Sequence, residues 1–426
     1  MKPSRTLCAF ALPLLVFMSA GICAQNLPTT KAEDVGLSSE RLARIGTWMQ
    51  GEVNAKRVPG AVVMVVRQGK VAYYEQVGQQ DTFTQRPMAR DSLFRIYSMT
   101  KPMVSVATMM MVEEGKITLE TPISRYIPAF ANSKVGVEKV NPTTGVKSLE
   151  LEPMRRPITV QDMLRHTSGL TYGFFGDSLV KKAYLDAGVG VSGDFTNEEF
   201  ANKLAALPLH YQPGSTWDYS YSTDVLGRVL EVVAGKPLYA LLKERLLDPL
   251  DMKDTSFYVT DTAKQARIAE PLPDDRVIGA GATVGDPRIA MKFESGGGGM
   301  VSTADDYARF LSMLTSGGVY KGKRFLSPRT IEYMSADHLG SSVATTPLYL
   351  PGAGHGFGLG FAVRKVTGES PWITPAGDYW WGGAGGTYFW VDPKSDMFVV
   401  FMMQSPKMRT VYRSVLRNMV YAAVEK

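Results

Sequence analysis

Strand patterns stand at both ends of this chain, with a long helical region between them. Near the N-terminus, two apolar, β-branched runs at residues 60–67 and 70–77 are joined by Gln68-Gly69, which predicts a β-hairpin. Near the C-terminus, strand composition returns at residues 356–363, 386–391 and 397–402. This arrangement indicates one antiparallel sheet to which both ends of the chain contribute strands.

The middle of the chain, residues 119–287, contains helical segments interrupted by Gly and Pro and predicts an all-helical insertion. The expected fold class is therefore α+β, with an antiparallel sheet flanked by helices plus this helical domain. The sheet domain would be discontinuous, comprising residues 25–118 and 288–426, with a site at the seam between the two domains. Apolar residues recur at helical spacing in residues 39–55, 160–166, 197–207, 225–233, 307–314 and 409–424.

Two local features refine this outline. The polar stretch at residues 132–156 predicts an excursion on the protein surface. Ser302 and Asp305 resemble the cap of the helix expected at 307–314, because a hydroxyl and a carboxylate three residues apart can satisfy the first N–H groups.

The first 24 residues have the pattern of a signal peptide. A charged start precedes an apolar run at residues 6–22, which is too short for a convincing membrane span, and cleavage is expected after Ala24. We therefore expect a periplasmic or secreted protein with no membrane contact once the signal is removed. Both cysteines, Cys8 and Cys23, lie in this segment, so the mature chain would have neither cysteine catalysis nor cysteine metal ligands.

Composition narrows the function classes. The formal net charge of +6 is spread thinly, without a basic stripe, so nucleic-acid binding is not expected. The four histidines are far apart in the sequence, so we expect no metal and no other cofactor. The chain also lacks the Gly-x-Ser-x-Gly motif, which argues against an α/β-hydrolase. The oligomeric state is not predicted.

Ser98 and Lys101 are the first candidate for chemistry. They stand where a short strand pattern meets an apolar helix that is closed by Gly115. Residues three apart on a helix share a face, so the hydroxyl and the amine would lie side by side. A serine becomes a strong nucleophile only when a neighbour removes its proton, and a helix N-terminus favours a nearby oxyanion. The pair therefore indicates acyl transfer through a serine ester.

The spacing alone does not decide the question. Ser98 could simply cap the helix, with Lys101 exposed one turn later. Ser178 and Lys181 repeat the same spacing in a charged, polar setting, which shows that the pattern also arises by chance. His166 is a tempting base, but it stands in a helix-ending Thr-Ser-Gly turn, where a structural hydrogen bond is favoured.

Two further segments could complete a site. Tyr219 lies in a loop that enters the helix expected at 225–233, so its phenol could relay the serine proton; Tyr221 offers an alternative register. Trp381-Gly382-Gly383-Ala384 precedes a strand, and its glycines would let an acyl group approach the backbone. A backbone N–H there could form an oxyanion hole together with the N–H of Ser98.

In their order and setting, these motifs resemble the penicillin-recognising serine hydrolases. The phrases at 164–170, 224–227, 296–302 and 357–360 fit as well, and the chain looks most like the family VIII carboxylesterases. The resemblance covers residues from about 35 to the C-terminus. It implies a β-lactamase/penicillin-binding-protein-like fold and an acyl-enzyme mechanism. Ser98 would be the nucleophile, Lys101 and Tyr219 its activating pair, and the N–H groups of Ser98 and Ala384 the oxyanion hole. Whether Lys101 or Tyr219 is the base stays open.

Two departures from the β-lactamase pattern bear on the substrate. Tyr221 stands where class C β-lactamases have Asn, and Trp381-Gly382-Gly383 replaces their Lys-Thr-Gly. Loss of that cation favours small neutral esters over anionic drugs. We therefore expect an esterase with weak side activity on β-lactams. The alternatives are a class C-like β-lactamase or D-Ala-D-Ala peptidase, and, in another class, a non-catalytic penicillin-binding sensor module.

Overall fold

The computed structural model describes residues 27–190, 193–279 and 282–426. The expected signal peptide, its cleavage point at Ala24 and both cysteines lie outside the described residues. Within these ranges, no helix has the length and apolar character needed to cross a bilayer.

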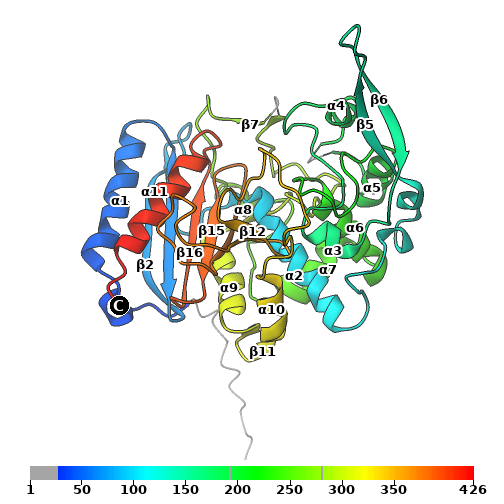
Figure 1. Ribbon diagram of the computed structural model, residues 1–426. Coiled ribbons are helices and arrows are strands. Elements are labelled where there is room, and N and C mark those ends of the chain that lie inside the picture. The colour runs from blue at the N-terminus through cyan, green and yellow to red at the C-terminus, as the bar shows by residue number, and fades with distance from the viewer. Residues whose placement is uncertain (1–26, 191–192, 280–281) are drawn as a thin grey trace, which may run out of the picture.

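One eight-stranded antiparallel sheet forms the centre of the molecule, in the order β12-β13-β14-β15-β16-β1-β2-β3 (Figure 1). Its N-terminal strands are β1 (Gly60–Arg67), β2 (Lys70–Asp81) and β3 (Arg86–Pro87). Its C-terminal strands are β12 (His355–Phe357), β13 (Ala362–Arg364), β14 (Tyr379–Gly382), β15 (Tyr388–Asp392) and β16 (Met397–Met403). Because β1 pairs with β16, the two chain ends meet in the middle of the sheet, as the strand pattern predicted.

The central strands are covered on both faces. Every residue of β1 and β16 is buried, which explains why these segments are continuous apolar runs without alternation. Helix α1 (Ser39–Asn54) packs on β1 and β2 and against α11 (Arg409–Ala422), while α9 (Ala304–Thr315) packs on β1 and β16. Gln68 and Gly69 turn the β1–β2 hairpin with φ values of 52° and 69°, the left-handed conformation that a two-residue hairpin loop requires.

The helical half lies beside the sheet and surrounds α2 (Thr100–Glu113), of which residues 100–111 are all buried (Figure 1). Helices α6 and α7 pack directly against α2. The remaining helices are α3 (Val160–Leu164), α4 (Leu179–Asp186), α5 (Asn197–Ala205), α6 (Ser222–Ala234), α7 (Leu238–Leu242), α8 (Thr262–Gln265) and α10 (Pro328–Met334). Short turns of 3₁₀ or π-helix occupy Glu33–Val35, Ile123–Arg125, Pro128–Asn132 and Lys243–Leu247.

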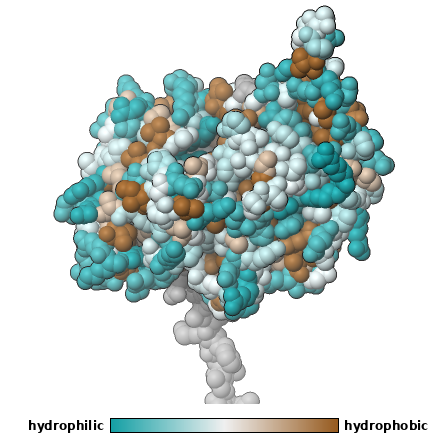
Figure 2. Space-filling model, in the orientation of Figure 1, coloured by the Kyte–Doolittle hydropathy of each residue, from teal (hydrophilic) through white to brown (hydrophobic). Residues whose placement is uncertain are grey.

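The insertion is not all-helical, so that part of the prediction is wrong. Strands β5 (Lys134–Val140) and β6 (Lys147–Pro153) form a hairpin that projects from the body and carries apolar side chains near its tip (Figure 2). The Asn141 side chain accepts from the N–H groups of Thr143 and Thr144, which closes the turn. A second hairpin joins β7 (Val277–Gly279) and β8 (Ala282–Thr283). The proposed domain boundaries stay a prediction.

Two other expectations also need correction. Residues 356–363 are not one strand: β12 and β13 are joined by a turn in which Gly360 has φ 98°, and a Cβ there would lie 2.4 Å from Ser105 Oγ. The cap of α9 is Thr303, which accepts from Asp306 N at 3.2 Å, because Ser302 belongs to strand β9 (Val301–Ser302). A small hairpin of β10 (Val319–Tyr320) and β11 (Lys323–Arg324) follows α9.

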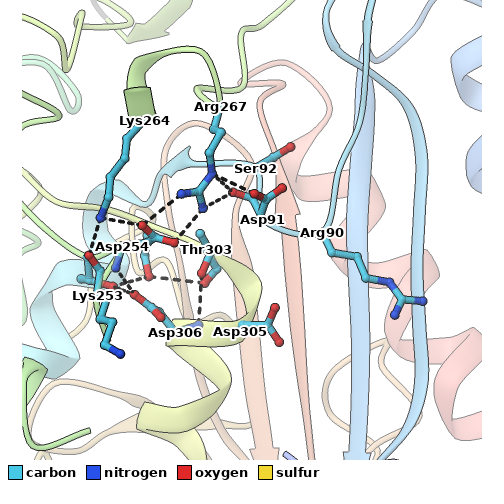
Figure 3. Close-up of polar contacts among 12 residues, drawn as sticks. Arg90, Asp91, Ser92, Lys253, Asp254, Lys264, Arg267, Thr303, Asp305 and Asp306 are labelled. Carbon is cyan, nitrogen blue, oxygen red and sulfur yellow. Dashed lines mark hydrogen bonds and ion pairs between the residues drawn. The ribbon is translucent and has the colours of Figure 1, made fainter. Parts of the chain in front are cut away.

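A polar network ties the segment from Asp254 to Arg267, which includes α8, to the start of α9 (Figure 3). Arg267 donates to both carboxylate oxygens of Asp254, at 3.1 and 2.7 Å, and Asp254 N donates to Asp306 at 2.8 Å. Strand β9 immediately precedes this helix and pairs with β4 (Phe94–Arg95). The network therefore supports the two-stranded ribbon from which the chain continues into Ser98.

Candidate functional site

Ser98 is presented by a strained turn between β4 and α2. Ile96 N donates to Met300 O at 3.0 Å, and the chain then reverses at Tyr97, whose φ is 44°. A bulky residue in the left-handed region costs on the order of 1 kcal/mol, and such strain is concentrated at functional sites. Ser98 lies in the short 3₁₀ helix Tyr97–Met99, just before α2, and is half-buried.

Lys101 lies in the first turn of α2 and is 1% exposed. Its Nζ donates to Ser98 Oγ at 3.3 Å, to Tyr172 Oη at 3.1 Å and to the Gly297 carbonyl at 2.6 Å. Three acceptors match the three N–H bonds of an ammonium group. A neutral amine would keep two donors for Tyr172 and Gly297, which leaves its lone pair directed at the serine hydroxyl. This geometry lets Lys101 remove the Ser98 proton.

Tyr219 faces the same amine with its ring rather than its hydroxyl. Lys101 Nζ lies 4.5 Å from the centre of the Tyr219 ring, and Tyr219 Oη accepts from Trp381 Nε1 at 3.1 Å. No hydrogen bond joins Tyr219 to Ser98 within the part of the chain that the structure describes. The structure thus brings Ser98, Lys101, Tyr219 and Trp381 together, with the lysine as the group bonded to the serine.

Tyr221, expected as a substrate-binding residue, does not line the pocket that contains Ser98. Its hydroxyl donates to the Val189 carbonyl at 2.9 Å, and its ring packs 4.3 Å from that of Tyr172, on the side facing α5. The two tyrosines therefore lie in different surroundings, and Tyr219 is the one that lines the pocket with Ser98.

Other candidates weighed from the sequence take structural positions. Ser178 Oγ accepts from Lys181 N at 3.1 Å and caps α4, while the buried Lys181 ammonium donates to the Phe175 carbonyl. His166 is buried behind Tyr219, its Nδ1 lies 3.2 Å from Ser220 Oγ, and burial holds its pKa well below the usual value. Neither serves the pocket directly.

Strand β14 ends at Gly382, and both Gly382 and Gly383 pack closely against other parts of the protein while also lining the pocket. A Cβ on Gly382 would lie 2.3 Å from an Arg413 guanidinium nitrogen. A Cβ on Gly383 would lie 2.4 Å from the Ile96 carbonyl. These glycines let the end of β14 pack against the backbone that carries Ser98, and their expected role beside an acyl group stays a prediction.

Two backbone N–H groups remain available beside the serine. Ser98 is the second residue of its 3₁₀ helix, so its N–H has no intrahelical acceptor. The Ala384 N–H has no acceptor among the described residues either. Both residues line the same pocket, and paired N–H donors of this kind can stabilise a tetrahedral oxyanion.

The pocket has a volume of about 460 Å³, and aromatic side chains form a large part of its walls. Large side chains on its walls include Tyr97, Tyr172, Phe174, Phe175, Trp372, Trp380 and Trp381, together with Ile278 and Leu350. Such a cavity suits a small, largely apolar molecule. Among the described residues, no group of three or more His, Asp or Glu side chains is arranged to hold a metal ion.

Three contributors to the site were missed from the sequence. Tyr172 bonds to Lys101, and burial raises its pKa well above the usual value, so the phenol stays protonated. The Gly297 carbonyl anchors the same amine, while Gly297 N donates to Asp224 Oδ1 at 3.0 Å. Asp224 and Gly297 lie within the sequence phrases at 224–227 and 296–302, so both carried a signal, whereas Tyr172 lies outside every phrase.

An antiparallel sheet flanked by helices, with a Ser-x-x-Lys pair at the wall of a pocket where a strand leads into a helix, defines a serine enzyme of the penicillin-recognising class. The chain belongs to the beta-lactamase family, whose sequence profile matches residues 45–422.

Relatives and solved structures agree with this assignment. The chain is 36% identical over 360 residues to Protein Rv1367c of Mycobacterium tuberculosis, covering 82% of this chain and 87% of the relative. It is 30% identical over 401 residues to Esterase EstB of Burkholderia gladioli, covering 89% and 95%. The structure of EstCE1, a hydrolase with promiscuous acyltransferase activity, superposes with a TM-score of 0.76 at 30% identity, over 90% of this chain and 99% of the other.

Proposed function

We propose that this protein is a carboxylesterase that cleaves small-molecule esters through an acyl intermediate on Ser98. The observation that carries the proposal is the buried Lys101 amine, bonded to Ser98 Oγ at 3.3 Å in an aromatic pocket. The names of the relatives Esterase EstB and EstCE1, the latter a hydrolase, support ester cleavage.

The proposed reaction follows from the contacts. Lys101 takes the Ser98 proton as the serine oxygen bonds to the ester carbonyl carbon, and the N–H groups of Ser98 and Ala384 stabilise the oxyanion. The carbon–oxygen bond to the alcohol then breaks, and the leaving oxygen takes a proton from Lys101 or through Tyr219, which Trp381 orients. Water attacks the acyl-serine by the same proton route in reverse and releases the acid.

Mutagenesis can test these roles with a matched pair of tyrosines. Ser98→Ala should abolish hydrolysis of 4-nitrophenyl butyrate while the protein stays folded. Lys101→Ala and Tyr219→Phe should each lower kcat about a hundredfold or more, the range for general acid–base groups. Tyr221→Phe is the control, because it loses only a structural hydrogen bond. A harmless Tyr219→Phe combined with an inactive Tyr221→Phe would reverse the assignment.

Rates on nitrocefin, measured in parallel, separate the related functions. We expect ester turnover to exceed nitrocefin turnover; the opposite order would favour a β-lactamase or D-Ala-D-Ala peptidase. Acylation that stops after one equivalent would indicate a penicillin-binding sensor module.

Export is also part of the proposal. We assign residues 1–24 as a signal peptide for a periplasmic or secreted enzyme, on the charged start and apolar run described above. Intact-mass measurement of the protein recovered from the native host should show a chain that begins at Gln25.

A further inference from the structure

We propose that a buried chain of hydrogen bonds positions the two phenols that contact Lys101 in the proposed reaction. The phenols belong to Tyr172, whose hydroxyl accepts from Lys101, and to Tyr219, whose ring centre lies 4.5 Å from the amine. The two rings also contact each other, with centres 5.2 Å apart. The inference rests on the proposed function and adds positioning residues to it, none of which lines the pocket.

The chain consists of one imidazole and three hydroxyl groups, which come in order from His166, Ser220, Ser222 and Ser168. His166 Nδ1 lies 3.2 Å from Ser220 Oγ, and each hydroxyl oxygen lies 2.8 Å from the next. All four residues are at most 1% exposed. Buried polar groups need partners within the protein, and these hydroxyls find them in one another and in the imidazole.

The available donors and acceptors define the direction of the chain. Leu170 N donates to Ser168 Oγ at 3.1 Å, so the Ser168 hydroxyl can in turn donate to Ser222. Each hydroxyl then donates to the next, and His166 Nδ1 is the final acceptor. An imidazole that accepts at Nδ1 and carries its proton at Nε2 is neutral. This agrees with the burial of His166, which holds its pKa well below the usual value.

His166 connects this chain to Tyr219 from a strained backbone. Its φ is 58°, a left-handed conformation in which the residue after a helix is usually Gly or Asn. Its ring centre lies 4.9 Å from that of Tyr219, with the rings inclined by 61°, and its carbonyl accepts from Asp218 N at 2.9 Å. A buried histidine kept in this costly conformation indicates a role for its side chain, and contact with the Tyr219 ring supplies one.

The other end of the chain holds the segment that leads to Tyr172. Ser168 is followed by Gly169, where a Cβ would lie 2.2 Å from the Tyr211 carbonyl oxygen, so the backbone here is tightly packed. The Ser168 hydroxyl bonds to Ser222 at the start of α6, and Tyr172 follows four residues later. The chain therefore links the segment of one phenol to that of the other, and breaking it should let both move relative to the amine.

Kinetic constants of folded variants on 4-nitrophenyl butyrate separate positioning from ordinary stability. Ser222→Ala breaks the chain in its middle and removes no group that bonds to either phenol. We expect kcat to fall about tenfold while KM changes less than about threefold, because the walls of the pocket stay the same. The matched control is Ser133→Ala, at another buried serine, whose hydroxyl donates to the Phe130 carbonyl, and it should keep kcat within about twofold.

Further variants test whether the chain acts as one unit. Ser220→Ala alone should lower kcat about tenfold, and Ser220→Ala combined with Ser222→Ala should also cost about tenfold rather than about a hundredfold, because one break already interrupts the chain. His166→Asn keeps an acceptor near the position of Nδ1 and tolerates the left-handed backbone, so it should retain more activity than His166→Ala. Ser168→Ala carries the same expectation as Ser222→Ala and replaces it if that variant does not fold.

The two proposals fail in different ways. If the wild type hydrolyses no ester, the proposed esterase function is wrong. The positioning chain alone is refuted if the wild type is active but Ser222→Ala keeps its kcat or changes only KM. It is also refuted if the losses from the two serine substitutions multiply in the double variant.

Discussion

Asp224 supports Lys101, the proposed general base, through the peptide group of Gly297. It is fully buried on α6, accepts from Gly297 N at 3.0 Å and also accepts from the Ser295 hydroxyl. The Gly297 carbonyl in turn accepts from Lys101 Nζ at 2.6 Å. Burial raises the pKa of Asp224, and the neighbouring positive charge of Lys101 opposes that rise. Asp224 is thus a positioning residue that acts through one peptide group.

Replacing Asp224 by alanine leaves two buried donors, Gly297 N–H and the Ser295 hydroxyl, without an acceptor. Each unsatisfied donor costs about 1–3 kcal/mol, and relief of the buried carboxylate offsets part of this sum. We expect a net loss of about 2–4 kcal/mol in the free energy of unfolding, measured by urea denaturation. The Gly297 carbonyl would also lose its fixed orientation, so kcat should fall about a hundredfold.

Asp224→Asn separates hydrogen bonding from charge, because its amide oxygen can still accept from both donors. We expect it to retain stability within about 1 kcal/mol and to retain more activity than Asp224→Ala. Asp186→Ala is the surface control, since Asp186 forms only an exposed pair with Lys182 and should change stability by less than about 1 kcal/mol. An Asp224→Ala protein with unchanged stability and kcat would refute this reasoning.

Three further perturbations follow from the same structure. Gly383→Ala places a Cβ 2.4 Å from the Ile96 carbonyl, so it should lower the free energy of unfolding by about 1–3 kcal/mol and also lower kcat. The control Gly51→Ala, which has open space around it on α1, should raise the free energy of unfolding by about 0.5–1 kcal/mol. Equal effects of the two variants would contradict the packing argument. Trp381→Phe removes the indole N–H that donates to Tyr219 Oη, and because this hydrogen bond orients the phenol, kcat should fall about tenfold in steady-state assays. An unchanged kcat would show that this hydrogen bond does not orient Tyr219. Burial lowers the pKa of His355 to about 4, so the native state resists protonation that the unfolded chain accepts below its ordinary pKa of 6.5. The free energy of unfolding should therefore be highest above pH 6.5 and fall by up to about 3 kcal/mol towards pH 4, and buried His166 acts in the same direction. His355→Gln should flatten this pH profile in denaturation curves. An equally steep profile in the variant would exclude His355 as the cause.

Local interactions account for what the sequence predicted well. The β1–β2 hairpin followed from Gln68-Gly69 between apolar runs, because a two-residue loop demands the left-handed backbone that these residues adopt. The closeness of Ser98 and Lys101 followed from helical spacing alone. The cap of α9 was predicted one residue too early, at Ser302 instead of Thr303. Ser302 belongs to strand β9 and pairs with Phe94, a residue about 200 positions earlier, which the local sequence does not indicate.

Long-range packing accounts for the errors in the site. Tyr219 and Tyr221 have nearly the same local sequence, and only the positions of α5 and β14 decide which ring reaches Lys101. The meaning of the glycines after Trp381 was likewise hidden, because the groups they accommodate, Arg413 and the Ile96 carbonyl, come from distant parts of the chain. A short sequence motif does not show which residues from distant parts of the chain will pack against it.

By itself, the sequence determined the sheet built from both chain ends, the serine and lysine on one helical turn, and the family to which they point. The strands and the Ser98–Lys101 pair follow from periodicity and spacing between residues close in the chain, while the family follows from the resemblance of the ordered motifs. The tertiary structure alone decided which groups surround the lysine and which tyrosine faces the pocket. Those contacts join segments up to some 300 residues apart, such as Thr387, whose hydroxyl donates to the Ile96 carbonyl, and they exist only after the sheet has formed. Burial then sets the charge and the hydrogen bonding of each group, because both depend on the water that folding removes.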